Sequence, residues 1–544
     1  MSPSISTDQN QSSSASSLTS TVRLNSSEPS TEHERNEAIP STVGAGNTSN
    51  DPIESDESKL KQLLTVLKKA IGVKDMGAMR LSLPANLMAP IGNLEYWCYL
   101  DRPDIFAAID HPDDELERML AVVRWTFTKD CKFVHSPICK PYNSVLGEQF
   151  KCIFDVTPAK VSPDTGDLYL LEAPSSPKCS SLPSSPLPSS PTTTIPLRSQ
   201  QRPSSLLTTT SSIITEDNVL GEPRRSVSTI ATTIPRQSVS TRVAFLNEQV
   251  SHHPPISCFW YESRTKASET EDFVSVAPSV VAHGVDQISA KFTGTSIKIF
   301  PGPMNKGIFV RLPNRSEEYH REEVADIVIS TSQITHPTAT ITGLLRASPY
   351  VVITDHTYIT CKSSGTNRYR AIISYLDESW LGKARFAAEG VIYEVKNQSE
   401  LEWNKIKHVP QDRIKCKLSG SWRGVINYTT PTMKKEQILV DLSKLFPVSK
   451  TVKPEENQED YETRKFWKDL TDLIAEKNYG EATKVKHNIE EAQRSLALKR
   501  KQNNETFRPK LFEIGDSVYL EMSQPELTSD GVKALNAEFG GIGY

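Results

Sequence analysis

The chain has 544 residues, of which 37% are hydrophobic and 24% charged, and its 36 prolines outnumber its 24 glycines. A chain of this polarity does not pack uniformly throughout, so part of it is expected to be disordered. The formal net charge of −4 excludes a global positive field that would attract nucleic acid or anionic lipid, and any such binding site must therefore be local. Eight cysteines without a CxxC pair argue against a disulfide framework and against a zinc ribbon.

The N-terminal sequence MSPSISTDQN lacks the basic and apolar regions of a secretory signal. No run of 18 apolar residues occurs anywhere in the sequence, which argues against a membrane-spanning helix. We therefore expect a cytoplasmic protein.

Two segments are too polar to fold by themselves. Residues 1–57 are mostly Ser, Thr, Asn, Glu and Pro, and residues 172–242 are rich in Ser, Thr and Pro. Neither buries enough apolar surface to offset a backbone entropy of roughly 1–2 kcal/mol per residue. The first is predicted to be a disordered tail and the second a disordered insert within a domain.

The insert contains sequences that suit protein kinases. Arg224 and Arg225 precede Ser226 and Ser228, and Ser-Pro pairs occur at Ser176, Ser185 and Ser190. Kinases are therefore expected partners, although any Ser-rich segment also collects such matches by chance.

The folded part is predicted to begin with an amphipathic helix at residues 59–71. Lysines occupy much of its circumference, and its apolar side chains follow i, i+3, i+4, i+7, i+11 spacing: Leu60, Leu63, Leu64, Leu67 and Ile71. A second, longer helix is predicted at about 113–128.

From Val243 to about Tyr393 the hydrophobic period becomes 2. Short β-branched segments, bounded by turn residues, are predicted strands at 273–281, 295–300, 308–312, 351–354 and 391–395. Many antiparallel strands in series indicate a barrel or a sandwich.

After Asp460 the period is helical again, with two apolar faces. One face consists of Phe466, Trp467, Leu470, Leu473 and Ile474, and the other of Val485, Ile489, Ala492 and Leu496. The order of helices, strands and helices predicts the α+β class.

The most unusual local sequence is EQVSHHPP, residues 248–255. Successive side chains of a strand point to opposite faces, so His252 and His253 can share a target only at a strand end, which Pro254 and Pro255 supply. Three explanations are open: a metal site, a structural histidine pair in a turn, or a pair of donors to an anion. A metal site is disfavoured because no third ligand stands at a suitable spacing.

Two further segments carry clustered polar residues. Lys486, Glu490 and Arg494 are spaced i, i+4, i+8 on a predicted helix. The first and last of these side chains differ in direction by only about 80° around the helix axis and lie ~12 Å apart along it. The three residues form either a solvated salt-bridged stripe or a set of phosphate ligands. The segment KPYNSVLGE, residues 140–148, places a lysine beside a glycine turn.

These three segments carry a resemblance to a known family. EQVSHHPP resembles the signature of the oxysterol-binding protein-related family, KPYNSVLGE its second motif, and Lys486 to Arg494 its third. They occur in the family's order, and the resemblance covers 58–171 and 243–513. The sequence departs from the family at Ser144, where the motif has proline, and in the insert at 172–242.

The resemblance implies a near-complete antiparallel β-barrel around a hydrophobic tunnel. The helix at 59–71 would be an N-terminal lid over the tunnel, and the last helices a C-terminal helical subdomain. Residues 58–171 would supply the lid, helices and first strands, and residues 243–544 the remaining strands and helices of the same domain. Tyr96, Trp97 and Tyr99 are candidate tunnel-wall residues, with ordinary core packing as the alternative.

The resemblance also implies a function. In the family the corresponding motif residues bind the headgroup of phosphatidylinositol 4-phosphate, and by position these are Lys140, Asn143, His252, His253, Lys486, Glu490 and Arg494. The chain is then expected to exchange this lipid for a sterol between membranes, visiting the endoplasmic reticulum, Golgi or plasma membrane transiently. The alternatives are an exchanger of phosphatidylserine, or a lipid sensor that binds without transferring.

An enzymatic activity is not expected. Cys258 and Arg264 match the C-x5-R spacing of cysteine phosphatases, but the bulky Phe-Trp-Tyr between them indicates a strand rather than a phosphate-cradling loop. No cofactor, metal or nucleic acid is expected.

Overall fold

The computed structural model describes residue 65 and residues 85–136, 139–170, 241–315, 331–343, 350–362, 368–376, 385–513 and 525–541. Its contacts divide the chain between residues 53 and 54, and all described residues belong to the second unit. The predicted tail at 1–57 and, apart from Thr65, the predicted lid at 59–71 lie outside the described residues. Of the predicted insert, only Thr241 and Arg242 are described, and they form the start of a strand.

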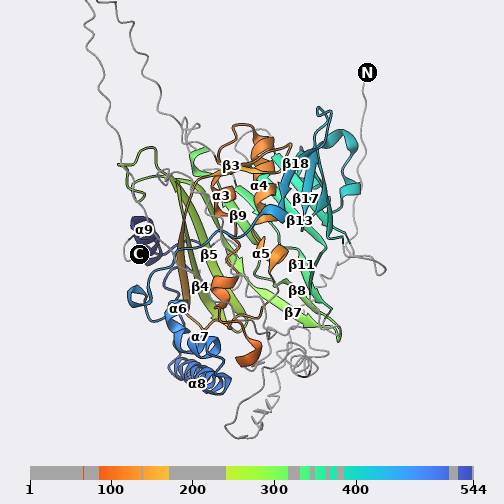
Figure 1. Ribbon diagram of the computed structural model, residues 1–544. Helices are drawn as coiled ribbons and strands as arrows, with labels where there is room; N and C mark the ends of the chain where they lie inside the picture. Colours follow the sequence, from red (N-terminus) through yellow and green to blue (C-terminus); the bar gives the residue numbers. More distant parts are fainter. Residues whose placement is uncertain are drawn as a thin grey trace, which may run out of the picture. The chain divides into compact units, whose positions relative to one another are not determined.

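A twelve-stranded antiparallel sheet dominates the fold (Figure 1). Its strands, in spatial order, are β1 (Gln149–Val156), β4 (Thr241–His252), β5 (Pro255–Thr265), β6 (Pro278–Asp286), β9 (Gly307–Arg311), β10 (Thr331–Ile334), β13 (His356–Lys362), β14 (Arg368–Tyr375), β15 (Ala387–Val395), β16 (Ile414–Ser421), β17 (Val425–Thr429) and β18 (Gln437–Asp441). β1 and β18 are its edges.

Two smaller sheets accompany the large one. The first consists, in spatial order, of β12 (Tyr350–Thr354), β11 (Thr338–Thr342), β8 (Ile297–Pro301) and β7 (Ile288–Phe292). The second consists of β2 (Ala159–Val161) and β3 (Leu168–Leu170).

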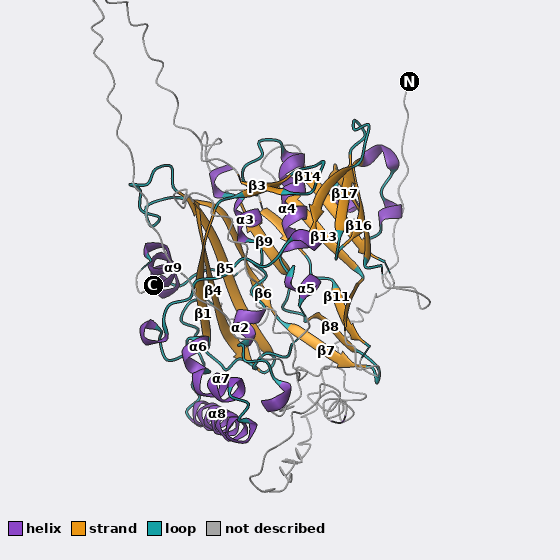
Figure 2. Ribbon diagram, viewed as in Figure 1, coloured by secondary structure: helices purple, strands orange, loops and turns teal. Residues whose placement is uncertain are grey.

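The described α-helices come before and after the strands of the three sheets in the sequence, and Figure 2 distinguishes the two element types by colour. They are α2 (Asn93–Tyr96), α3 (Pro103–Ala107), α4 (Glu115–Thr128), α5 (Lys132–His135), α6 (Thr463–Phe466), α7 (Lys468–Ala475), α8 (Tyr479–Gln502) and α9 (Ser529–Gly540). Helices combined with a large antiparallel sheet confirm the predicted mixture of the two element types.

Strand β4 is covered on both faces. In β4, Val243 and Phe245 belong to the main core cluster, whereas Ala244 and Leu246 belong to a second cluster with Phe539 of α9. Side chains of a strand alternate between faces, so both faces must be apolar when both are covered. This is why residues 243–246 of β4, Val-Ala-Phe-Leu, are a continuous apolar run instead of an alternating one.

The helices α3 and α4 pack against the face of the sheet that carries the main core cluster. α3 contacts β1, β4 and β6, and α4 contacts β14 and β18, so together they touch strands near both edges. The ring of Trp125 on α4 is fully buried, 5.1 Å from Phe106 and 6.5 Å from Tyr261 of β5. Asp114 begins α4 by accepting a hydrogen bond from the Glu117 amide at 2.9 Å, which confirms the predicted helix at 113–128 within two residues.

Two sequence predictions need correction. The predicted strand at 273–281 begins only at Pro278, because Phe273–Ser275 form a turn in which the Ser275 amide donates to Asp272. The predicted second face of the last helical region ends at Ile489, since Ala492 and Leu496 of α8 are exposed. Periodicity alone does not show where a helix loses its packing partner.

Candidate functional site

The segment 140–148 is fastened to the end of β4. The Gly147 amide donates to the Gln249 carbonyl at 2.9 Å, and the Gln249 amide donates to the Glu148 carbonyl at 2.8 Å. Gly147 has φ +82°, a conformation that a side chain would strain. Two motifs separated by about a hundred residues thus form one unit.

The side chain of Glu148 stabilises this segment through hydrogen bonds. Its carboxylate is fully buried and accepts hydrogen bonds from the Val145 amide at 3.0 Å and from the Thr463 hydroxyl at 2.9 Å. Burial raises the pKa of Glu148 to about 7, although these hydrogen bonds favour the ionised form. Glu148 therefore shapes the loop and is not available to a ligand.

The histidine pair stands beside the same loop. Nδ1 of His252 donates to the carbonyl of Ser144 at 3.0 Å, and the rings of His252 and His253 are 4.5 Å apart. A register shift between Gln249 and Ser251 and a cis bond before Pro254 accompany the turn between β4 and β5. Because the contact uses a backbone carbonyl, the serine found here in place of the motif's proline does not remove it.

Helix α8 brings the third motif to this loop. Val485 and Ile489 of α8 pack against a cluster that includes Tyr142 and Trp467, whose rings are 5.0 Å apart. Figure 1 shows α6, α7 and α8 together at one end of the long strands. The fold therefore places Lys486 near Lys140, although the two residues are far apart in the sequence.

The three residues of the helix motif form an ion-paired chain. Nζ of Lys486 lies 2.5 Å from Oε1 of Glu490, and Nη2 of Arg494 lies 3.4 Å from Oε2 of the same carboxylate. Arg494 also pairs with Glu491 at 2.9 Å. The side chains of Lys486, Glu490 and Arg494 are 11%, 31% and 55% exposed, so the set extends from the packed interior out to solvent.

The ammonium group of Lys140 lies close to a second positive charge. The residue is exposed, but its ammonium group is turned back onto the chain and donates to the Pro141 carbonyl at 2.9 Å and to Oδ1 of Asn143 at 2.7 Å. Desolvation, and after it the positive charge of Lys486, lowers the pKa of Lys140 to about 8. The positive charge of Lys486 thus disfavours the charged form of Lys140, and an anion bound beside Lys140 would relieve this repulsion.

The structure thus brings residues of all three motifs into one region. Direct contacts join Lys140 to Asn143 and Glu490 to both Lys486 and Arg494, while His252 contacts the loop that carries Lys140 and Asn143. The donors comprise ammonium, guanidinium, imidazole and amide groups, which together can bind an anionic group with attached hydroxyls.

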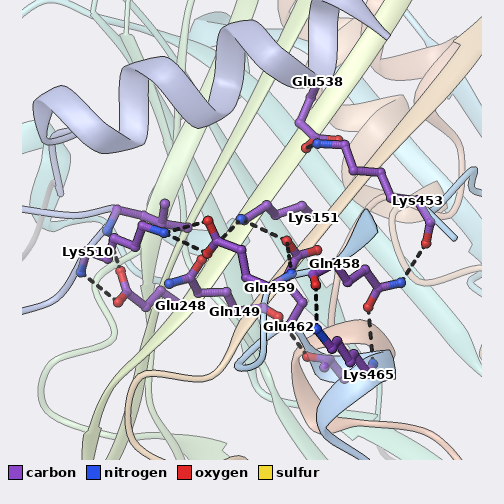
Figure 3. Close-up of polar contacts among 12 residues, drawn as sticks. Gln149, Lys151, Glu248, Lys453, Gln458, Glu459, Glu462, Lys465, Lys510 and Glu538 are labelled. Carbon is purple, nitrogen blue, oxygen red and sulfur yellow. Dashed lines mark hydrogen bonds and ion pairs between the residues drawn. The ribbon is translucent and has the colours of Figure 1, made fainter. Parts of the chain in front are cut away.

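Glu248, the first residue of the EQVSHHPP motif, has a structural role that the motif alone does not indicate. It is buried and accepts from the amides of Lys510 and Leu511 at 2.8 and 2.7 Å, so it fixes the segment that follows α8 onto β4. Burial raises its pKa. Figure 3 shows the surrounding network, in which Lys510 binds Glu459 at 2.6 Å and Lys151 binds Glu462 at 3.1 Å.

The aromatic residues proposed for a tunnel wall belong to the interior. Tyr99 is buried, and its hydroxyl donates to Oδ2 of Asp286 at 2.9 Å. Trp97 is partly buried against the main core, 5.1 Å from the buried ring of Tyr96. Contact with a ligand remains a prediction for all three.

The environment of Cys258 does not favour nucleophilic catalysis. Cys258 is fully buried in β5, and burial raises the pKa of its thiol, which opposes nucleophilic attack. Within the described ranges no group of three His, Cys, Asp or Glu could hold a metal ion. Among the same residues, no helix has both the length and the apolar character needed to cross a bilayer.

Comparison with known families identifies the class of protein. The family model described as oxysterol-binding protein matches residues 62–165 and 217–528, which is most of the chain. The chain therefore belongs to the oxysterol-binding protein family. Proteins of this family bind lipids and are not enzymes, which agrees with the sequence-based expectation of no enzymatic activity.

Individual relatives give the extent of the similarity. The chain is 36% identical over 511 residues to oxysterol-binding protein-like protein 1 of Schizosaccharomyces pombe, covering 89% of this chain and 91% of that protein. It is 26% identical over 462 residues to human oxysterol-binding protein-related protein 11, covering 85% of this chain but only 48% of the human protein.

A solved structure shares the fold. The Osh1 ORD domain, solved in complex with cholesterol, superposes with a TM-score of 0.50 at 17% sequence identity, covering 88% of this chain and 89% of that domain. The same domain in complex with ergosterol also gives a TM-score of 0.50.

Proposed function

We propose that the chain is a lipid-transfer protein that exchanges phosphatidylinositol 4-phosphate for a sterol between membranes. The observation that carries the proposal is the convergence of Lys140, His252, Lys486 and Arg494 from three motifs. In a chain of net charge −4, this local collection of cationic and hydrogen-bonding groups suits a doubly charged phosphomonoester.

Each residue has a task in this proposal. Lys140 and Lys486, whose charges oppose each other in the free protein, would both be neutralised by the 4-phosphate, and Arg494 would bind it through its guanidinium fork. His252 and His253 would donate to phosphate oxygens, while Asn143 and Glu490 would bind inositol hydroxyls. Glu490 would also hold the two cations of α8 in place.

The apolar part of either lipid needs a lined interior. We infer that the twelve-stranded sheet and the helices on its inner side form a near-complete barrel around a tunnel, in one lipid-binding domain built from 58–171 and 243–544. Reburial of the lipid at ~25 cal/mol per Å² of apolar surface would offset the cost of extracting it from a bilayer. The predicted lid at 59–71 would complete that burial, a part of the proposal that rests on sequence.

Sterol is the proposed second ligand because the Osh1 ORD domain, which shares this fold, has been solved with cholesterol and with ergosterol. The alternatives are phosphatidylserine as the second ligand, and a sensor that binds lipid without moving it. Mass spectrometry of copurifying lipids distinguishes the first, and a transfer assay between two vesicle populations distinguishes the second. The protein would act in the cytoplasm and visit membranes transiently.

The headgroup assignment is tested with the double variant His252→Ala and His253→Ala. We expect it to lose extraction of phosphatidylinositol 4-phosphate from vesicles while it keeps binding of a fluorescent sterol. The variant His408→Ala, which removes an exposed histidine after β15, is the control and should retain both. Equal loss of both ligands in the double variant would indicate misfolding and remove the support for the assignment.

A further inference from the structure

Helix α8 consists of two halves with different surroundings. In the first half, Ala482 is buried and Val485 and Ile489 pack against the cluster around Trp467. From Ala492 onward nearly every side chain is exposed, including two leucines that are 39% and 56% exposed, Leu496 and Leu498. We call residues 492–502 the α8 tip. At 1.5 Å per residue the tip is about 16 Å long.

The charges of the two halves also differ. The first half carries both signs and pairs them, as Lys484 does with Glu481 and Lys486 does with Glu490. Residues 492–504 contain no acidic residue and four basic ones, which are Arg494, Lys499, Arg500 and Lys501. This positive run lies in a chain whose net charge is −4.

A helix C-terminus favours basic residues in any protein, because they interact with the negative end of the helix dipole. That effect accounts for three cations in the last turn. It does not account for Leu498, since an exposed leucine gains nothing from the dipole and leaves apolar surface in water. Leu498, followed directly by the cations Lys499, Arg500 and Lys501, combines exposed apolar surface with positive charge, and this combination suits a surface that enters the interface of an anionic membrane.

The geometry connects the tip to the candidate headgroup site. Arg494, Leu498 and Lys501 are spaced i, i+4, i+7 and therefore share one face of the helix. At 100° per residue, this face continues the direction of Lys486, Glu490 and Arg494. The row that carries the candidate ligands thus runs without a break into the exposed tip.

We propose that the α8 tip is the surface by which the protein docks on a bilayer containing anionic lipids. Leu498 enters the boundary between headgroups and acyl chains, and Lys501, about one turn further along the same face, binds a lipid phosphate. A second copy of this chain is a poorer occupant, because two tips of the same positive charge would repel each other. Docking through the tip sets the headgroup site beside the bilayer from which the lipid is extracted. The purpose of docking therefore rests on the proposed function.

The test measures binding of the full chain to vesicles of phosphatidylcholine with or without phosphatidylserine, both lacking phosphoinositide. The test variant is Leu498→Ser with Lys501→Glu, and neither residue belongs to the proposed headgroup set. The matched control is Val532→Ser with Lys533→Glu on α9, where the side chains are similarly exposed and the change in charge is the same. We expect the test variant to lose at least tenfold in affinity for the anionic vesicles and the control to bind like wild type.

Binding of a water-soluble, short-chain phosphatidylinositol 4-phosphate separates this proposal from the proposed function. The test variant should keep it, which also shows that the variant is folded. If wild type does not bind the short-chain lipid, the headgroup assignment fails while the vesicle result still stands. Unchanged vesicle binding by the test variant, or equal loss in the α9 control, would overturn the docking proposal. A wild-type dimer that the test variant makes monomeric would assign the tip to a second copy instead.

Discussion

At the scale of single residues, burial divides the charged groups of the three motifs. Glu148 and Glu248 are buried and accept hydrogen bonds from the protein itself, whereas Lys140 and Arg494 are exposed. The motif spacing predicted the second group. The first could not be predicted, because its partners Thr463 and Lys510 lie 315 and 262 residues away in sequence.

Glu148 makes stability depend on pH. Between pH 4.5 and about 7 the native carboxyl holds a proton that the unfolded chain releases, so stability falls as pH rises through this window, by about 3 kcal/mol at most. Glu148→Gln should remove this contribution and be more stable than wild type above pH 7. In the variant, the side-chain amide of the new glutamine can donate to the oxygen of the Thr463 hydroxyl. That hydroxyl can then donate its proton to the Gln149 carbonyl, which lies 3.0 Å away.

Urea unfolding of wild type and Glu148→Gln at pH 5 and pH 8 measures this difference. A variant whose stability falls by the same amount as wild type between the two values would assign the pH dependence to other groups.

Lys140 makes headgroup binding depend on pH in a different window. With its pKa near 8, the free protein increasingly loses the ammonium charge above that value, and binding a phosphate must then restore the proton. Affinity for short-chain phosphatidylinositol 4-phosphate should therefore fall by up to about tenfold per pH unit above 8. Calorimetry in buffers of different ionisation enthalpy should show proton uptake at pH 9.

Lys140→Arg is the control for this prediction. Its guanidinium stays charged, so its affinity should be lower in absolute terms but nearly constant between pH 7 and pH 9. A pH slope as steep as that of wild type would mean that another group titrates.

At the scale of secondary structure, α8 shows both the strength and the limit of periodicity. The pattern of Val485, Ile489, Ala492 and Leu496 correctly predicted a helix. It could not show that packing ends after Ile489, because that depends on where α7 and the loop around Tyr142 end in space. The long strands show the same limit, since apolar residues on both faces of β4 reflect two covering layers that a short window does not contain.

The two halves of α8 should respond differently to truncation. Ile489→Ala removes a contact with the cluster around Trp467 and should destabilise by about 2 kcal/mol, at the lower end for such changes because the residue is only partly buried. Leu496→Ala on the same helix should cost less than about 0.5 kcal/mol. Urea unfolding measures both, and similar values would contradict the assigned difference in packing.

At the scale of the whole molecule, one sheet is assembled from distant parts of the chain. β1 and β4 pair over eight residues, from Gln149 with Glu248 to Val156 with Thr241, although residues 171–240 separate β3 from β4. The motifs predicted that both parts belong together. The strand order could not be predicted, because it follows from pairings between residues far apart in sequence.

The pairing also shows that a short connection would suffice. Leu170 pairs with Ala159, only three residues beyond Val156, which is the partner of Thr241. These steps put the two ends within about 20 Å, and ten extended residues reach about 33 Å. Replacing residues 171–240 by a ten-residue Gly-Ser linker should therefore preserve sterol binding.

The shorter loop should also raise stability by about 1–2 kcal/mol, through its smaller closure entropy. Unfolding and ligand-binding measurements on the shortened chain test this. A loss of sterol binding together with lower stability would mean that the replaced residues contribute to the folded domain.

The register between β1 and β4 has a further consequence for the integrity of the chain. Eight paired residues, with a fully buried Phe150 and Phe245 whose rings are 6.0 Å apart, hold the two strands together independently of the covalent connection between them. A peptide bond cut between residues 170 and 241 would leave both fragments in one sheet. We therefore expect the parts of the chain before and after this connection to assemble by strand pairing when they are produced as two separate fragments.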